Sequence, residues 1–162
     1  YSTMHIVFIL FLFITPFSFS QYCDSIPEIN KKIVTLAKKK IGKKVNRGEC
    51  WDLVKYVLDK TDSKWDKFEV YGELINWKKE CIKPGDIIQF EKIKLEWEDG
   101  NTTYNEEMKH HTAVVQKVIS EDLILILHQN TAEHGRKVGS SKLRLDAIKK
   151  GKLYIYRPVE SN

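Results

Sequence analysis

The order of hydrophobic patterns along the chain is the feature that most constrains its fold. Apolar residues recur at helical spacing over residues 29–41 and again over residues 50–59. From Pro84 onward the pattern changes to short β-rich runs, of which "KPGDIIQF" is the first. Helices followed by an antiparallel sheet, without alternation of the two, predict the α+β class with the helices packed on the sheet.

The β-rich part contains several expected elements. Residues 111–119 ("HTAVVQKVI") and 123–130 ("LILILHQN") are predicted to form a hairpin, and residues 152–158 a closing strand. A polar hairpin or loop is expected at residues 98–109. Residues 61–72 are expected to be irregular and residues 73–80 to form a short helical piece.

The first twenty residues have a separate pattern. An apolar run at residues 6–13 is followed by Pro16 and by Ser18-Phe19-Ser20, which is the order of a signal peptide cleaved before Gln21. The run is short for a membrane span of ~20 residues, so a retained anchor is the weaker alternative. We therefore expect a signal peptide at residues 1–20, one domain at residues 21–162, and a secreted or periplasmic protein without membrane insertion after signal removal.

The net charge of the chain bears on the kind of binding partner that it can have. The net charge is +5 and the sequence pI is about 9.0, which is compatible with an anionic neighbour or simply with a solvated lysine face. The sequence contains no Gly-rich phosphate loop and no recognisable nucleic-acid module, so no nucleic-acid partner is expected.

The chain has three cysteines, Cys23, Cys50 and Cys81. In an oxidising compartment an odd number leaves one thiol unpaired. Pairing of Cys23 with Cys81 would leave Cys50 free, although the sequence alone does not prove that pairing. For an exported chain we expect this disulfide, with Cys50 reduced.

Cys50 begins the second predicted helix, directly after the loop "NRGE". Unpaired N–H groups and the helix dipole favour an anion at such a position, and a thiolate is a better nucleophile than a thiol. A nucleophilic cysteine also needs a base, and the base needs a group that orients it. On its own, a cysteine in this place is more often a packing residue than a catalyst.

Candidate partners of Cys50 lie in the predicted hairpin. His111 begins one strand, and His128 and Asn130 end the next. Because the start of one strand lies beside the end of its antiparallel neighbour, these side chains are expected to meet at one end of the sheet. His128 or Asn130 would then accept a hydrogen bond from His111 and fix its tautomer.

Four blocks in this order, "GECWDLV", "KPGDIIQF", "HHTAVV" and "LHQN", resemble the papain-fold NlpC and CHAP group of cysteine peptidases and amidases. Within that group the chain is most similar to a divergent branch. This branch is the cysteine-proteinase-fold domain at the C-terminus of some fungal actin-patch proteins, which has plant and bacterial relatives. The resemblance covers about residues 29–158 and implies a papain-like fold.

The resemblance also implies roles for single residues. Cys50 would be the nucleophile and His111 the base, in preference to His110; His128 and Asn130 would orient the base. A His111 paired with a thiolate would hold its proton above the ordinary pKa of ~6.5. The chain departs from the pattern upstream of Cys50, where no glutamine or tyrosine is placed to complete an oxyanion hole. The backbone N–H of Cys50 would have to serve, with Asn46 or Glu49 nearby.

We therefore expect a secreted cysteine hydrolase that cleaves an amide bond in a peptide or in the stem peptides of bacterial peptidoglycan. The alternative is a catalytically inactive papain-fold module that binds a peptide or a glycan. No cofactor and no metal are expected, because the histidines lack the spacing of known metal motifs. A monomer is expected.

Overall fold

The computed structural model describes Cys23 and residues 25–161. The predicted signal peptide at residues 1–20 lies outside the described residues. Within the described part of the chain, no helix has the length and apolar character needed to cross a membrane.

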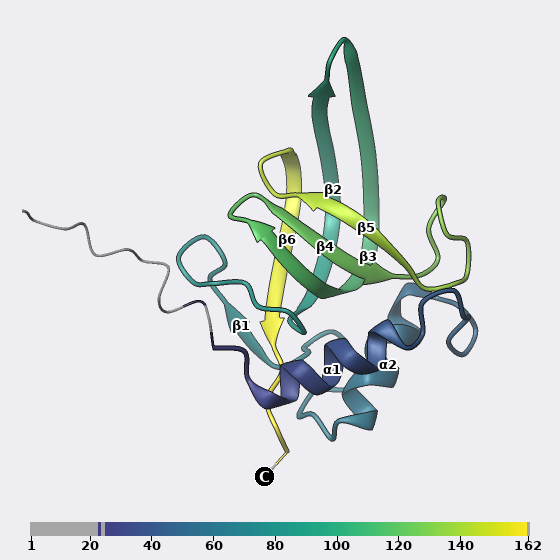
Figure 1. The fold of residues 1–162 in the computed structure, drawn as a ribbon, viewed down its shortest axis with the longest axis vertical. Coiled ribbons are helices and arrows are strands. Elements are labelled where there is room, and N and C mark those ends of the chain that lie inside the picture. The colour runs from purple at the N-terminus through teal and green to yellow at the C-terminus, as the bar shows by residue number, and fades with distance from the viewer. Residues whose placement is uncertain (1–22, 24, 162) are drawn as a thin grey trace, which may run out of the picture.

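Two helices precede the sheet, as the hydrophobic pattern predicts (Figure 1). Helix α1 spans Glu28–Lys38 and follows Pro27, whose fixed φ suits the start of a helix. Helix α2 spans Cys50–Lys60 and begins with a capping box in which the side chains of Glu49 and Asp52 bind each other's backbone N–H groups. This box satisfies N–H groups that would otherwise lack partners, so it fixes the helix start at Cys50.

The rest of the fold is a six-stranded antiparallel sheet with the strand order β1-β6-β2-β3-β4-β5. The strands are β1 (Glu73–Ile75), β2 (Ile87–Asp99), β3 (Thr102–Ser120), β4 (Leu123–His128), β5 (Gly139–Arg144) and β6 (Ile148–Arg157). Both helices lie on the same side of the sheet, and β2 and β3 project beyond the other strands as a two-stranded ribbon (Figure 1). The predicted α+β arrangement, with helices packed on an antiparallel sheet, is confirmed.

Two local expectations were wrong, and one was confirmed in one of its two forms. Residues 73–75 form an edge strand instead of a helical piece, because they pair with residues 155–157 of β6. Of the two alternatives for residues 98–109, the hairpin is confirmed: apart from the turn at residues 100–101, they belong to β2 and β3. The start of the next strand at His111 is wrong. Strand β3 therefore begins at Thr102, and His111 lies within it. The cause is the long β2–β3 pairing, which runs past the end of β4.

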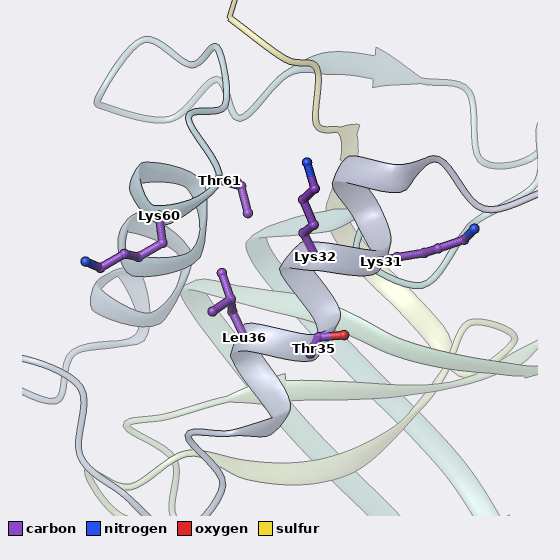
Figure 2. A pocket seen from close by; sticks show the side chains of 6 residues that line it. All are labelled: Lys31, Lys32, Thr35, Leu36, Lys60 and Thr61. Carbon is purple, nitrogen blue, oxygen red and sulfur yellow. The ribbon is translucent and has the colours of Figure 1, made fainter.

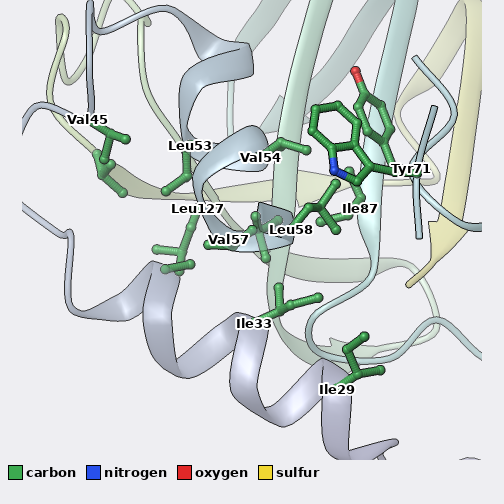
Figure 3. Close-up of a cluster of buried hydrophobic side chains, with 14 residues drawn as sticks. Ile29, Ile33, Val45, Leu53, Val54, Val57, Leu58, Tyr71, Ile87 and Leu127 are labelled. Atoms are coloured by element: carbon green, nitrogen blue, oxygen red, sulfur yellow. The ribbon is translucent and has the colours of Figure 1, made fainter. Parts of the chain in front are cut away.

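The apolar core has two parts, one on each face of the sheet. The first part lies between the helices and the sheet (Figure 3), where Leu53 and Val57 of α2 pack with Val114 and Leu127. The second part contains Phe90, Ala113, Val115 and Ile126, which alternate with residues of the first. The sheet is thus buried on both sides in its central strands.

The "PGD" turn joins the helices to the sheet. Gly85 has a φ of +87°, and a Cβ there would lie 2.3 Å from the backbone oxygen of Asn30 in α1. Buried Asp86 accepts hydrogen bonds from Asn30 Nδ2 (2.8 Å), from Arg157 of β6 (2.9 and 3.2 Å) and from the Lys83 N–H. The turn therefore holds α1 and β6 in place, which is a structural role for this motif.

A disulfide joins Cys23 to Cys81, with the two Cα atoms 5.5 Å apart, and Cys50 is free. The expected pairing is confirmed. It ties the chain before α1 to the loop that precedes β2.

Candidate active site

Cys50 is half-buried and is the first residue of α2. The loop before it is held by Asp52, whose carboxylate accepts hydrogen bonds from Asn46 Nδ2 (2.9 Å) and from the Glu49 N–H (3.0 Å). The thiol is therefore placed at a helix N-terminus with fixed geometry, where an anion is favoured.

Gln129 connects this loop to the end of β4. Its side chain is fully buried and makes three hydrogen bonds across the chain. Nε2 donates to the carbonyl oxygens of Val45 (3.1 Å) and Glu49 (2.7 Å), and Oε1 accepts from the Val45 N–H (3.2 Å). The start of α2 is thereby attached to the residue that directly follows His128.

Asn130 contributes to the same connection. Its Nδ2 donates to Glu49 Oε2 at 2.8 Å on the protein surface, and its φ of +63° turns the chain out of the strand. The structure brings Asn130 to the residue before Cys50, whereas its side-chain hydrogen bond does not go to His111. Asn130 therefore contacts the cap of helix α2 in the structure, and it does not contact the predicted base.

The structure brings His111 and His128 together, as the hairpin argument predicts. His111 Nε2 lies 3.0 Å from His128 Nδ1, and the two rings meet edge to face. Both side chains are buried. The ring of His111 also contacts Phe90, so the pair lies on the face of the sheet opposite to the helices and to Cys50.

His110 lies on the opposite face of the sheet from His111. Side chains alternate along β3, so His110 is on the side of Val114 and the helices. Its Nε2 lies 2.9 Å from Gln89 Nε2 and 3.1 Å from Glu69 Oε1, and 52% of its side chain is exposed. The structure thus places His110, instead of the expected base His111, on the side of the sheet that carries Cys50.

Burial determines the charge of the histidine pair. Desolvation and the nearby His110 lower the pKa of His111 to about 4. Desolvation, together with His111 and His134, lowers the pKa of His128 to about 3. The expectation of a raised His111 pKa is wrong for this structure, because burial opposes the imidazolium and its hydrogen-bond partner is a histidine instead of a carboxylate. Both rings are neutral at pH 7.

The groups proposed for an oxyanion hole are already engaged. The Asn46 amide donates to Asp52, and Glu49 is occupied in the capping box and with Asn130. In the part of the chain that the structure describes, no hydrogen bond links the Cys50 thiol to a histidine. The backbone N–H groups at the start of α2 are then the donors nearest to the thiol along the chain.

The sequence argument missed three residues of this region: Gln129, Ser141 and Gln89. Gln129 lies inside the quoted block "LHQN". Because side chains alternate between the two faces along β4, Gln129 could have been predicted to lie on the helix side of the sheet, opposite to His128. Ser141 and Gln89 had no sequence signal, because a single serine or glutamine in a strand is common.

A pocket of about 420 Å³ lies between the helices, away from these residues (Figure 2). It is lined by Lys31, Lys32, Thr35, Leu36, Lys60 and Thr61. Lys31 and Lys32 form ion pairs with Glu28 and Glu160. None of the candidate catalytic residues contributes to this pocket.

Two helices on one face of an antiparallel sheet, with a free cysteine that opens the second helix, characterise the cysteine-proteinase fold. The chain belongs to the family of the AIM3/BBC1 cysteine proteinase-fold domain, whose model matches residues 23–162. The resemblance of the four sequence blocks to this branch is confirmed.

Two solved structures are similar to the chain. "The crystal structure of Ly7917" has 15% sequence identity and a TM-score of 0.49, with 78% of this chain and 62% of that chain covered. "The crystal structure of Ly7917 with the hydrolyzing product of MDP" has 17% identity and a TM-score of 0.49, with 80% and 62% covered. The chain thus spans less than two thirds of the length of these solved chains. No curated protein matches it.

Proposed function

We propose that this domain is a papain-like cysteine hydrolase of the NlpC/CHAP type, in which Cys50 attacks an amide carbonyl. The observation that supports this most strongly is the triple hydrogen bond of Gln129, which holds the start of α2 at the end of the strand that carries His128. The nucleophile is thereby attached to the end of β4 on the helix side of the sheet, which is the face that also carries His110, whereas His111 and His128 lie on the other face.

In this proposal His110, which lies on the helix side of the sheet with Cys50, acts as the general base in place of the expected His111. The His110 imidazole takes the proton of the Cys50 thiol, and the thiolate forms a bond with the carbonyl carbon of the substrate. The imidazolium then gives the proton to the leaving amine, and water releases the acyl group from the sulfur in a second step. N–H groups at the start of α2 are placed to stabilise the oxyanion.

The proposed substrate is a peptide or the peptide stem of peptidoglycan, and the proposed setting is outside the cytoplasm. The disulfide between Cys23 and Cys81 supports an oxidising compartment. The net charge of +5 suits an approach to an anionic cell wall.

A second function is favoured by one observation. In the described residues the Cys50 thiol makes no hydrogen bond to a histidine, and Asn46 is engaged elsewhere. A domain that keeps the fold and binds a peptide or glycan without turnover would have these properties.

Alkylation of Cys50 by iodoacetamide at pH 7 separates the two functions. The hydrolase predicts labelling faster than that of a free peptide thiol, and a loss of this advantage in His110→Ala. His111→Ala is the matched control, because it changes the neighbouring histidine on the other face of the sheet. Labelling at the rate of a free thiol would contradict the hydrolase, whereas a loss in His111→Ala alone would contradict His110 as the base.

A further inference from the structure

The tip of the β2–β3 ribbon carries a polar motif that the proposed hydrolysis does not use. Residues 101–103 read Asn-Thr-Thr, an asparagine followed two positions later by a hydroxyl residue, with no proline between them. This pattern is the acceptor motif for N-linked glycosylation in secreted proteins. Asn101 is the only asparagine of the sequence that has serine or threonine two positions later. Because so short a motif also arises by chance, its place in the fold decides whether it can be used.

The structure places Asn101 in the turn that closes the ribbon. Asp99 pairs with Thr102, so the connection between the two strands consists of Gly100 and Asn101 alone. Gly100 has a φ of +60°, whereas the φ of Asn101 is not positive, which is the pattern of a two-residue hairpin turn with glycine first. Glycine thus takes the left-handed conformation, and the asparagine keeps an unstrained backbone.

The turn is open to solvent. Residues 98–107 are all exposed, and a Cβ built on Gly100 would meet no heavy atom within 4 Å apart from its chain neighbours. Among the residues that the structure describes, none forms a hydrogen bond with the side chain of Asn101 or of Thr103. The amide nitrogen that a transferase must reach is therefore accessible in the folded protein.

An aromatic pair holds the tip in shape. Trp97 of β2 lies opposite Tyr104 of β3, and their rings stack with centroids 5.3 Å apart and planes inclined by 8°. Such cross-strand pairs stabilise a two-stranded ribbon. The acceptor motif is thus displayed on a formed hairpin, at the end of the molecule opposite to both helices (Figure 1).

The disulfide bears on the compartment in which the motif would be used. The bond between Cys23 and Cys81 is of a kind that forms in oxidising compartments, such as the lumen of the secretory route. N-linked glycans are found on proteins of that route. The apolar run at residues 6–13, with the order of a signal peptide, predicts the same destination.

We propose that Asn101 is an N-glycosylation site at the tip of the ribbon, and that the sugar donor is an oligosaccharide carried on a lipid diphosphate. Nδ2 of Asn101 forms a bond with the anomeric carbon of the first sugar and loses one proton. The bond between that carbon and the diphosphate oxygen breaks, and the lipid diphosphate leaves with the electron pair. The inference depends on export of the chain and is independent of the hydrolase function.

Secretion of the full chain from cultured eukaryotic cells tests the site. The wild type is expected to migrate as a slower band on a gel. Peptide N-glycosidase should remove the shift and leave an aspartate in place of Asn101, which mass spectrometry detects. Asn101→Gln and Thr103→Ala should each abolish the slower band, whereas Thr103→Ser, which keeps the hydroxyl, should retain it. Asn105→Gln is the matched control, because Asn105 is an exposed asparagine of the same ribbon without a hydroxyl residue two positions later.

Two outcomes would overturn the proposal. One is a secreted wild type with an intact disulfide between Cys23 and Cys81 and an unmodified Asn101, because that chain has passed through the required compartment. The other is a slower band that persists in Asn101→Gln. The same chain behind a strong secretory leader is tested in parallel, and a missing glycan there counts against the site in the same way. The rate of Cys50 alkylation should be equal in the wild type and in Asn101→Gln, so the gel shift tests the glycan and the alkylation tests the hydrolase.

Discussion

Gln129 Nε2 and the carbonyl oxygen of Glu49 lie 2.7 Å apart, although 80 positions separate the two residues in the sequence. This contact places the first turn of α2 against the end of β4. The position of Cys50 relative to the helix side of the sheet therefore depends on one buried amide side chain.

Replacement of Gln129 tests this dependence. Gln129→Leu has a similar size but leaves buried Val45 and Glu49 backbone groups without partners, which costs about 2–4 kcal/mol of unfolding free energy. We also expect slower alkylation of Cys50. Asn130→Ala is the control, since it removes one exposed hydrogen bond to Glu49 and should cost less than about 1 kcal/mol. Chemical denaturation measures both; equal losses would show that Gln129 has no special role.

The identity of residue 128 should control the charge of His111. In His128→Glu a carboxylate replaces the neutral acceptor, which stabilises the imidazolium and raises the His111 pKa from about 4. In His128→Ala the acceptor is lost and the ring of His111 is free to change its tautomer. The NMR titration of the His111 ring should therefore differ among the three proteins, and superimposable titrations would show that His128 does not orient His111.

Stability should fall as the solution is acidified from pH 7 to pH 5. The folded-state pKa values of His111 and His128, about 4 and about 3, lie below the unfolded value of 6.5, so unfolding takes up protons in this range. The contribution is fully present above pH 6.5 and is lost toward the folded pKa values. By pH 5 the loss is ~2 kcal/mol for each histidine.

Denaturation midpoints at the two pH values measure this effect. His128→Gln removes one of the two groups and should show about half of the wild-type loss. His110→Ala, a change at a half-exposed ring, should keep the full loss. A wild-type stability that does not change between pH 7 and pH 5 would contradict neutral burial of the pair.

Thr112 should be a stabilising site for mutation. Its hydroxyl is buried on the helix side of the sheet and has no hydrogen-bond partner. Burial of such a group costs about 1–3 kcal/mol in proteins, so the isosteric change Thr112→Val should raise the unfolding free energy by about 1 kcal/mol or more. Thr112→Ser, which keeps the hydroxyl and loses a methyl group, should lower it. A less stable valine variant would indicate that the hydroxyl has a partner in solution.

The disulfide gives a further test. Cys81→Ser should lower the unfolding free energy by ~2–4 kcal/mol, because it releases a loop of 58 positions in the unfolded chain. Peptide mapping without reductant should find Cys23 bonded to Cys81 and Cys50 open to iodoacetamide. A disulfide that contains Cys50 would contradict both this assignment and the nucleophile.

The sequence predicts those parts of the fold that depend on local patterns. Periodicity identified α1 and α2, and the hairpin argument brought His111 to His128. Strand β1 was missed because its three residues are stabilised by pairing with β6, which no local pattern reports. The hairpin at the tip of the ribbon was expected only as an alternative to a loop, because its polar residues carry no apolar alternation that would mark them as strands.

The candidate site was predictable only where its residues lie in one hairpin. The contacts of Gln129 with Glu49 and of Ser141 with Glu133 depend on how loops close around the sheet. The lowered pKa of His111 could not be predicted either, because the sequence does not show that only 7% of this residue is exposed to solvent.

The long ribbon of β2 and β3 has a consequence for self-association. Before Val114, strand β3 pairs with β2 alone, so its other edge presents unpaired backbone groups to solvent. Such an edge is a template for a strand of a second molecule, and aggregation can begin there. Exposed Glu106, Glu107 and Lys109 lie along this edge, and their charges oppose the approach of another strand. Solubility of the domain thus depends on side chains that contribute nothing to its core.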